Sequence, residues 1–285
     1  MLNRERYNQA LSALSTLGEF DPLTRQTLLD EEWHTQLALN ALGITPESSV
    51  SIIPGINQIV NPPSTTRAEK PGDIFIEVAG IPKAMKTSLI RKAAQRLPLI
   101  RIKEVAREIK GQIKETDWSD LSGLGGYYAI YESFKHSRLA EYYLRMGGRN
   151  RPKIIDRGIL DCLPFLRSHF LLGRIKREPF KTISDFFRIP LSSNNSQLTN
   201  KHALVICLIT PKLSLEREGQ RETPGDVMNL TFLSTLYGQY LRLYHELLSQ
   251  PASFPFACID MSGSFDQNWR IFNQTLKRII ASFIP

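Results

Sequence analysis

Residues 74–97 read IFIEVAGIPKAMKTSLIRKAAQRL, and this stretch decides the expected fold. It starts with a short apolar run of the kind found in buried strands (74–79) and ends in a basic amphipathic helix pattern (86–97). A loop that starts at Gly80 joins the two. Because backbone N–H groups at a helix N-terminus attract anions, a strand, loop and helix in this order predict an anion-binding unit.

The loop matches the phosphate-binding pattern GxxxxGK[ST] of P-loop proteins at every fixed position except one. Met85 stands where the pattern has its second glycine. We expect Lys86 to reach the β and γ phosphates of a nucleotide and the Thr87 hydroxyl to ligate Mg²⁺. The predicted ligands are ATP or GTP and Mg²⁺, and the predicted nucleotide-binding residues are Gly80, Ile81, Pro82, Lys83, Ala84, Met85, Lys86, Thr87 and Ser88.

A glycine beside the lysine lets the backbone approach the phosphate and tolerates dihedral angles that cost other residues free energy. We therefore expect Met85 to weaken or abolish nucleotide binding. Three explanations stay open at this point. The site is naturally degenerate, the residue is an engineered substitution, or the loop rearranges enough to bind a nucleotide in spite of the side chain.

Strand and helix signals alternate through the rest of the chain, which is the pattern of a parallel sheet covered by helices on both faces. We expect strands at 74–79, 99–102, 153–156, 203–209 and 256–261, and helices at 86–97, 127–146, 158–172, 211–219, 226–249 and 266–282. The polar segment 173–200 is expected to be an insertion. The predicted fold class is α/β: a three-layer α/β/α P-loop NTPase fold with a parallel five-stranded sheet.

A helical N-terminal extension is expected to precede this domain. Residues 4–43 carry apolar side chains at helical spacing, and residues 44–72 collect the prolines, serines and threonines typical of a linker. The predicted division is an extension with linker over 1–70 and a nucleotide-binding domain over 71–285.

The net charge of +8 is unevenly distributed. Residues 1–70 hold 5 Lys/Arg against 8 Asp/Glu, which leaves 31 against 20 in the remainder. A basic domain is expected of a site for polyanionic nucleotides and also of a nucleic-acid binder, so charge alone does not separate the two.

Several classes of protein are disfavoured by the sequence. No apolar run approaches the roughly 20 residues of a membrane-spanning helix, and the start has no signal-peptide pattern. We therefore expect a soluble, cytoplasmic protein with no membrane partner. The five histidines and three cysteines form no metal-ligand spacing, so no metal other than Mg²⁺ is expected.

The order of motifs after the loop resembles that of the P-loop nucleoside and nucleotide kinases, the group that includes thymidylate kinase and the deoxynucleoside kinases. The resemblance covers about residues 72–285 and includes KIIDRGILD, in which Asp156 and Arg157 end a central strand. It implies that Asp156 holds Mg²⁺ or the acceptor and that Arg157 neutralises charge on the transferring phosphoryl group. The alternative is an ion pair at the end of a strand with no chemistry.

The resemblance implies three further site residues and one loop. Glu104 follows the second strand, where it would take the proton of an acceptor hydroxyl, or it is a solvated helix residue. Arg217 and Arg221 stand at the position of an arginine-bearing lid over the phosphates, or they are an exposed charged helix end. Ser262, Gly263 and Ser264 form the loop after the last strand, which would lie near the adenine.

The preferred hypothesis is an ATP-dependent phosphotransferase, or a descendant of one, that acts on a nucleoside, a nucleotide or another small acceptor. In the second hypothesis the chain is a nucleotide-regulated interaction module that binds a protein partner through residues 1–70. A third hypothesis uses the basic domain to bind or phosphorylate the ends of nucleic acids.

Overall fold

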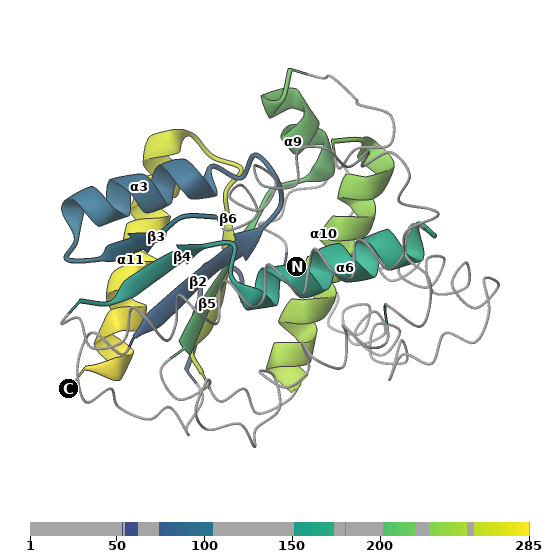
Figure 1. The fold of residues 1–285 in the computed structure, drawn as a ribbon. Coiled ribbons are helices and arrows are strands. Elements are labelled where there is room, and N and C mark those ends of the chain that lie inside the picture. Colours follow the sequence, from purple (N-terminus) through teal and green to yellow (C-terminus); the bar gives the residue numbers. More distant parts are fainter. Residues whose placement is uncertain are drawn as a thin grey trace, which may run out of the picture.

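Six strands form one sheet in the order β1-β6-β5-β2-β4-β3 in the computed structural model of the chain (Figure 1). The structure describes residues 53, 55–61, 74–104, 151–173, 180, 202–219, 228–249 and 254–284. The strands are β1 (Ile59–Val60), β2 (Phe75–Gly80), β3 (Ile100–Ile102), β4 (Lys153–Asp156), β5 (His202–Leu208) and β6 (Phe256–Asp260). The helices are α3 (Lys86–Arg96), α6 (Ile159–Leu171), α9 (Pro211–Arg217), α10 (Leu230–Ser249) and α11 (Phe265–Phe283).

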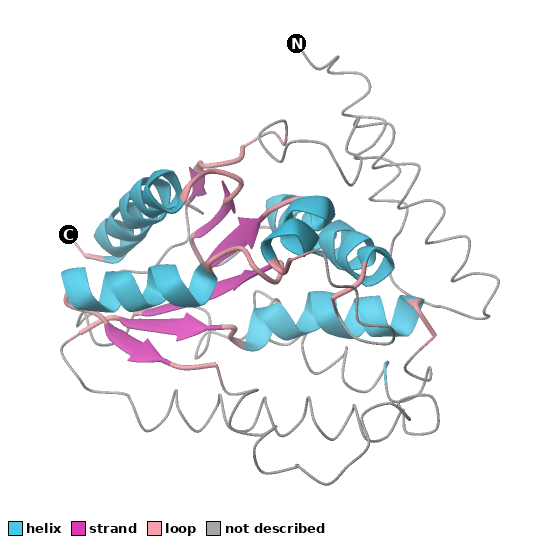
Figure 2. Cartoon of the chain, turned by 90° about the horizontal axis from the view of Figure 1, so that it is seen from above, coloured by secondary structure: helices cyan, strands magenta, loops and turns pink. Residues whose placement is uncertain are grey.

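Helices cover both faces of the sheet and make a three-layer α/β/α arrangement, as expected. Figure 2 shows α3 and α11 on one face and α6 and α10 on the other. Strands β2 to β6 are mutually parallel where they pair. Because parallel strands all end at the same edge of a sheet, the segments that follow β2, β4, β5 and β6 come together there.

The sheet has six strands and not the five expected, because a short strand, β1, precedes β2. In β1, Ile59 and Val60 pair antiparallel with Ala257 and Phe256 of β6. Asn57 anchors this strand: its backbone N–H donates to the Cys258 carbonyl at 2.7 Å, and its side-chain oxygen accepts from the Asp260 N–H at 2.9 Å. Two-residue strands are too short to give a period-2 signal, so sequence patterns alone do not identify them.

The other expected strands and helices that fall on described residues are present, within a few residues of the expected bounds. The strands are mostly apolar, as expected of a sheet that helices cover on both faces, and β5 is buried at every residue. The helices expected within residues 4–43 and 127–146, and the expected insertion beyond Gly173, lie outside the described residues except Phe180.

Helix α11 shows how one helix serves both the core and the surface. Its Phe272, Leu276, Ile279 and Phe283 are fully buried, at the spacing of one helix face. Ser264 and Gln267 form a capping box that satisfies N–H groups at its start.

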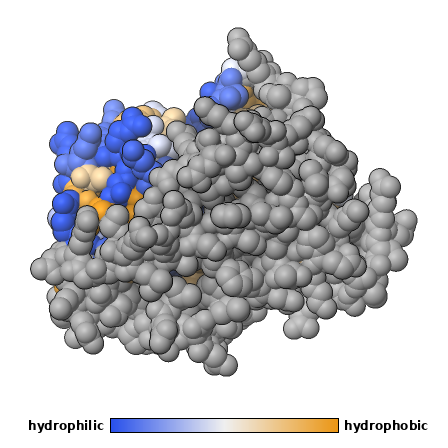
Figure 3. Space-filling model, in the orientation of Figure 1, coloured by the Kyte–Doolittle hydropathy of each residue, from blue (hydrophilic) through white to orange (hydrophobic). Residues whose placement is uncertain are grey.

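The exposed surface over α3 is hydrophilic (Figure 3) and includes Arg91 and Arg96. None of the described helices is long and apolar enough to cross a bilayer.

Candidate functional site

Residues 80–85, which carry the phosphate-loop pattern of the sequence and are called the phosphate loop below, form a tight turn between β2 and α3. Three of its residues have positive φ angles: Gly80 at 131°, Lys83 at 60° and Met85 at 61°. A Cβ at Gly80 would lie 2.0 Å from the carbonyl oxygen of Cys207, so only glycine fits between β2 and β5 at this point. The loop therefore turns sharply at the end of the central strand and leads directly to the first residue of α3.

Lys86, the first residue of α3, reaches back into the loop. Its Nζ donates hydrogen bonds to the carbonyl oxygens of Gly80 at 2.7 Å and Ile81 at 2.6 Å. Burial lowers the pKa of Lys86 to about 8, and the positive charge of Arg157 adds to this effect. The ammonium group thus lies inside the curve of the loop.

Met85 adopts the left-handed conformation, with φ 61° and ψ 10°, at the position where the motif has its second glycine. Its sulfur lies 3.7 Å from the Asn268 Nδ2. The same amide nitrogen donates to the carbonyl oxygens of Met261 and Gly263, both at 2.9 Å. The Met85 side chain is therefore held against α11 and the loop before it, while its backbone has the dihedral angles that a glycine would supply.

Thr87 and Asp156 come from separate elements and meet beside the loop. The Thr87 hydroxyl donates to Asp156 Oδ2 at 2.7 Å. Asp156 is only 1% exposed, and its other oxygen, Oδ1, is buried without a hydrogen-bond partner. A buried carboxylate oxygen with no donor is costly unless something not present in this structure, such as a cation, satisfies it.

Arg157, the residue after β4, pairs with Glu104, which lies two residues beyond the end of β3. Its Nε lies 3.1 Å from Glu104 Oε1, and its Nη1 lies 3.0 Å from Asp161 Oδ2. The guanidinium also lies 4.9 Å from the centre of the Phe165 ring. Burial acts to lower the pKa of Arg157, but the neighbouring acidic groups, Asp161 foremost, outweigh it and raise the pKa.

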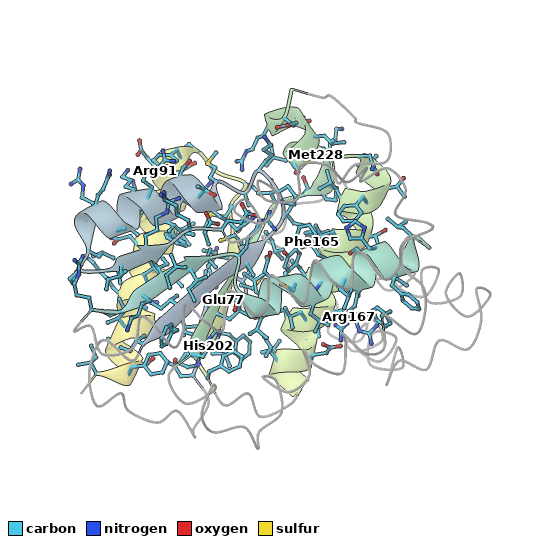
Figure 4. The ribbon with its side chains drawn as sticks, in the orientation of Figure 1. Glu77, Arg91, Phe165, Arg167, His202 and Met228 are labelled. Atoms are coloured by element: carbon cyan, nitrogen blue, oxygen red, sulfur yellow. The ribbon has the colours of Figure 1, made fainter. Side chains whose placement is uncertain are left out.

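Glu77 is a fully buried carboxylate in the central strand β2. It lies where β2 meets the first turn of α6 (Figure 4), and its Oε1 accepts from the Asp161 N–H at 2.7 Å. His202 Nε2 lies 3.4 Å from Glu77 Oε2, which is within ion-pair range but lacks the geometry of a hydrogen bond. A Cβ at Gly158 would lie 2.3 Å from Glu77 Cδ, so Gly158 leaves the space that this carboxylate fills.

Helix α9 and the residue that follows it contact the phosphate loop through three side chains. The Ser214 hydroxyl donates to the Pro82 carbonyl at 2.9 Å, and Lys83 forms an ion pair with Glu218. Arg217 donates to three backbone carbonyl oxygens: Lys83 at 3.3 Å, Ser262 at 3.3 Å and Gly263 at 3.1 Å. One guanidinium therefore joins the phosphate loop to the loop between β6 and α11.

The structure brings most of the sequence-predicted residues to one edge of the sheet. Gly80, Lys86 and Thr87 lie in or beside the loop, and Asp156, Arg157, Glu104 and Arg217 surround it. Ser88 is exposed in the first turn of α3. Arg221 lies outside the described residues.

Sequence reasoning missed three residues that the structure joins to this site: Glu77, Asp161 and Asn268. Asp161 follows Arg157 by four residues, so a helix after β4 predicts that their side chains lie on one face. A glutamate inside an apolar strand run such as FIEVAG is also a signal that can be read, because an unpaired buried carboxylate is rare. The contact of Asn268 with Met85 crosses 183 positions and has no local signal.

No cluster of three or more His, Cys, Asp or Glu side chains suited to a metal ion occurs among the residues that the structure describes. The side chains of Cys162, Cys207 and Cys258 are buried.

Comparison with known proteins gives no match to a family model or to a curated protein. Three solved structures of deoxyadenosine kinase from M. mycoides are similar to this chain. The structure with bound dCTP matches with a TM-score of 0.53 and 16% identity, and the one with the products dCMP and a flexible dCDP with 0.54 and 16%; each match covers 72% of this chain and 100% of the other. The structure with bound dATP matches with a TM-score of 0.53 and 15% identity, covering 72% of this chain and 99% of the other. At this identity the likeness concerns the fold, and the chain therefore has the fold of the P-loop nucleoside kinases.

Proposed function

We propose that the chain binds a nucleoside triphosphate with Mg²⁺ on the loop 80–87 and transfers the terminal phosphoryl group to a hydroxyl of a small acceptor. The observation that carries this proposal is the contact between Thr87 and Asp156 at 2.7 Å, directly beside Lys86. Phosphoryl transfer needs oxygen ligands for a metal ion and a cation for the phosphate charge. The hydroxyl of Thr87 and the carboxylate of Asp156 would be the oxygen ligands, and Lys86 would be the cation. The triphosphate is ATP or GTP.

The loop would hold the phosphates through backbone N–H groups at the start of α3 and through Lys86. The Lys86 ammonium donates hydrogen bonds to two carbonyl oxygens of the loop. A bound phosphate would replace these oxygens as its hydrogen-bond acceptor, and the ammonium group is already close to that position. Because α3 begins at Lys86, its free N–H groups and its dipole favour an anion at this end.

The Mg²⁺ site fits the residues present. The buried Asp156 Oδ1 has no hydrogen-bond partner, and the Thr87 hydroxyl is adjacent to the same carboxylate. Mg²⁺ is commonly held by one or two protein oxygens together with phosphate oxygens and water, so few ligands suffice. When bound, the ion would supply charge neutralisation between the β and γ phosphates.

Glu104 would serve the acceptor, and Arg157 would neutralise charge on the transferring phosphoryl group. Glu104 is a carboxylate that can accept the proton of a hydroxyl, and Arg157 lies 3.1 Å from it with a permanent positive charge. The acceptor class is suggested by the deoxyadenosine kinases of similar fold, whose structures contain dATP, dCTP and dCMP. We therefore propose a nucleoside, with deoxyadenosine and deoxycytidine as the first candidates.

Met85 is compatible with this proposal. The expected obstacle was a side chain directed at the phosphates, but its sulfur contacts Asn268 of α11. The conformational cost of the left-handed backbone is about 1–2 kcal/mol for a residue with a side chain. The contact with α11 and the partial burial of the methionine offset part of that cost.

The test compares binding of Mg-ATP by calorimetry in the wild type, Lys86→Ala and Lys277→Ala. Lys277 is an exposed lysine on α11 and controls for the loss of one positive charge. We expect the wild type and the control to bind equally and Lys86→Ala to bind about 10- to 100-fold more weakly, as for the loss of charge-assisted hydrogen bonds. A wild type that binds neither Mg-ATP nor Mg-GTP would refute the proposal.

The reaction itself is tested by following ADP formation with a panel of deoxynucleosides. We expect acceptor-dependent ADP formation in the wild type and its loss in Thr87→Val, which keeps the shape of the side chain but removes the hydroxyl. ATP binding without transfer to any acceptor would leave a nucleotide-binding protein and contradict the phosphotransferase assignment.

A further inference from the structure

Asp161 lies at the centre of the polar contacts behind the phosphate loop, although no sequence motif selects it. It is fully buried in the first turn of α6. Its Oδ1 accepts from the Gly80 N–H at 2.9 Å and from the Tyr240 hydroxyl at 2.6 Å. Its Oδ2 accepts from Arg157 Nη1 at 3.0 Å. One carboxylate therefore contacts the start of the phosphate loop, helix α10 and the arginine after β4.

The backbone of Asp161 completes a reciprocal link with strand β2. Its N–H donates to Glu77 Oε1, while its own carboxylate accepts from the N–H of Gly80, three residues further along the same strand. Glu77 thereby satisfies an N–H at the start of α6, because the N-cap residue Gly158 has no side chain to do so. The first turn of α6 is thus fixed to β2 on both sides of residues 78 and 79.

We propose that Asp161 is a positioning residue for phosphoryl transfer, because its carboxylate fixes the guanidinium of Arg157 relative to the loop that begins at Gly80. This inference rests on the proposed function. The Arg157 side chain is only 14% exposed and lies between two acidic partners, Glu104 and Asp161. Without Asp161, Glu104 would be the one ion-pair partner left to the guanidinium among the described residues, and the Phe165 ring contacts only its face.

The negative charge of Asp161 is needed for its ion pair with Arg157, and a neutral side chain of the same shape would not replace it. Gly80 and Tyr240 are neutral donors, so the oxygen of a neutral amide would still accept from both, although more weakly than a carboxylate. Arg157 is always charged, and its pairing in a buried site is much stronger with a carboxylate than with an amide. Asp161→Asn therefore separates the support of the loop from the support of the arginine.

The experiment measures kcat for transfer to deoxyadenosine or deoxycytidine, and the Kd of Mg-ATP, in the wild type, Asp161→Asn and Asp266→Asn. Asp266 is an exposed carboxylate on α11 that pairs with Lys92, and it controls for the loss of one negative charge. We expect Asp161→Asn to lower kcat by about 100-fold, as for a catalytic group displaced by about 1 Å, and to change Kd less than about threefold. Each kcat is normalised to the ATP-binding stoichiometry, so an unfolded fraction does not enter.

A double-mutant cycle shows whether Asp161 acts through Arg157. In an Arg157→Ala background, adding Asp161→Asn should lower kcat by less than about threefold further, because the group that it positions is already absent. If Asp161→Asn does not fold, Asp161→Glu decides. It keeps the charge beside Arg157, so we expect kcat within about tenfold of the wild type, whereas a residue needed only for packing predicts a larger loss.

The outcomes separate this inference from the function on which it rests. A wild type with no transfer would overturn both. An active wild type with equal kcat in Asp161→Asn and Asp266→Asn would overturn the inference alone. The inference would also fail if Asp161→Asn weakened Mg-ATP binding as much as transfer, or if its effect on kcat were fully additive with that of Arg157→Ala.

Discussion

The sulfur of Met85 lies 3.7 Å from the side-chain nitrogen of Asn268, so the one residue that departs from the phosphate-loop motif is held by helix α11. The loop keeps a left-handed backbone at this position without a glycine. Since Asn268 also bonds the carbonyl oxygens of Met261 and Gly263, the contact joins the phosphate loop to the loop before α11. The effect of the methionine therefore depends on where its side chain goes and not on its size alone.

Met85→Gly should bind Mg-ATP within about threefold of the wild-type affinity, because the wild-type side chain is already directed away from the loop. Met85→Val should bind more weakly and lower the free energy of unfolding by about 1–2 kcal/mol, since a β-branched residue is strained at positive φ. Calorimetry and urea unfolding measure the two effects. If Met85→Gly bound more than about tenfold better, the methionine would be an obstacle and the loop a weakened site.

Arg217→Met should weaken binding of Mg-ATP by about tenfold, because the loss of charged donors to three carbonyl oxygens releases the loop at Lys83 from the segment 262–263. Methionine keeps much of the length of the side chain. Lys212→Met, at an exposed position of the same helix, is the matched control and should bind like the wild type. Equal affinities in both variants would show that this brace does not support the nucleotide site.

Gly158→Ala should lower the free energy of unfolding by at least about 2 kcal/mol, because its Cβ would fall 2.3 Å from Glu77 Cδ in a buried site. Gly173→Ala is the control: this glycine has φ 69° but open space around it, so only about 1 kcal/mol of backbone strain is expected. Denaturant unfolding compares the two. Glu77→Ala in the Gly158→Ala background should recover part of the loss if the clash is its cause.

The sequence predicted the parallel sheet because its strands are apolar runs buried on both faces, and the strand–loop–helix unit because its signal is local. Asp156, Arg157 and Glu104 were expected from the resemblance to the nucleoside kinases, and parallel topology brings Glu104 to Arg157 and Thr87 to Asp156. Strand β1 was missed because two residues give no period. Asp161 and Asn268 were missed because their roles come from contacts with residues far away in the chain, such as Gly80 and Met85.

The stability of the protein should fall as the pH drops from about 6.5 to 4, in part because of His245 on α10. His245 is only 8% exposed, and this burial lowers its pKa to about 4. In the unfolded chain His245 has a pKa near 6.5, so between pH 6.5 and 4 it is protonated there but mostly neutral in the folded protein. This difference favours unfolding by up to about 3 kcal/mol at pH 4. The neighbouring Glu246 acts in the same direction at lower pH: burial acts to raise its pKa, but Arg167 and Arg242 outweigh this and lower it.

His245→Phe should remove the part of this pH dependence that lies between pH 6.5 and about 4.5, above the range in which Glu246 titrates. Urea unfolding of the wild type and the variant at pH 7.5 and pH 5 measures it as a difference of differences, so that any loss of packing common to both pH values cancels. We expect the free energy of unfolding to decrease less in the variant than in the wild type. Equal decreases would mean that the imidazole accepts its proton in the folded protein and that His245 is not buried in its neutral form.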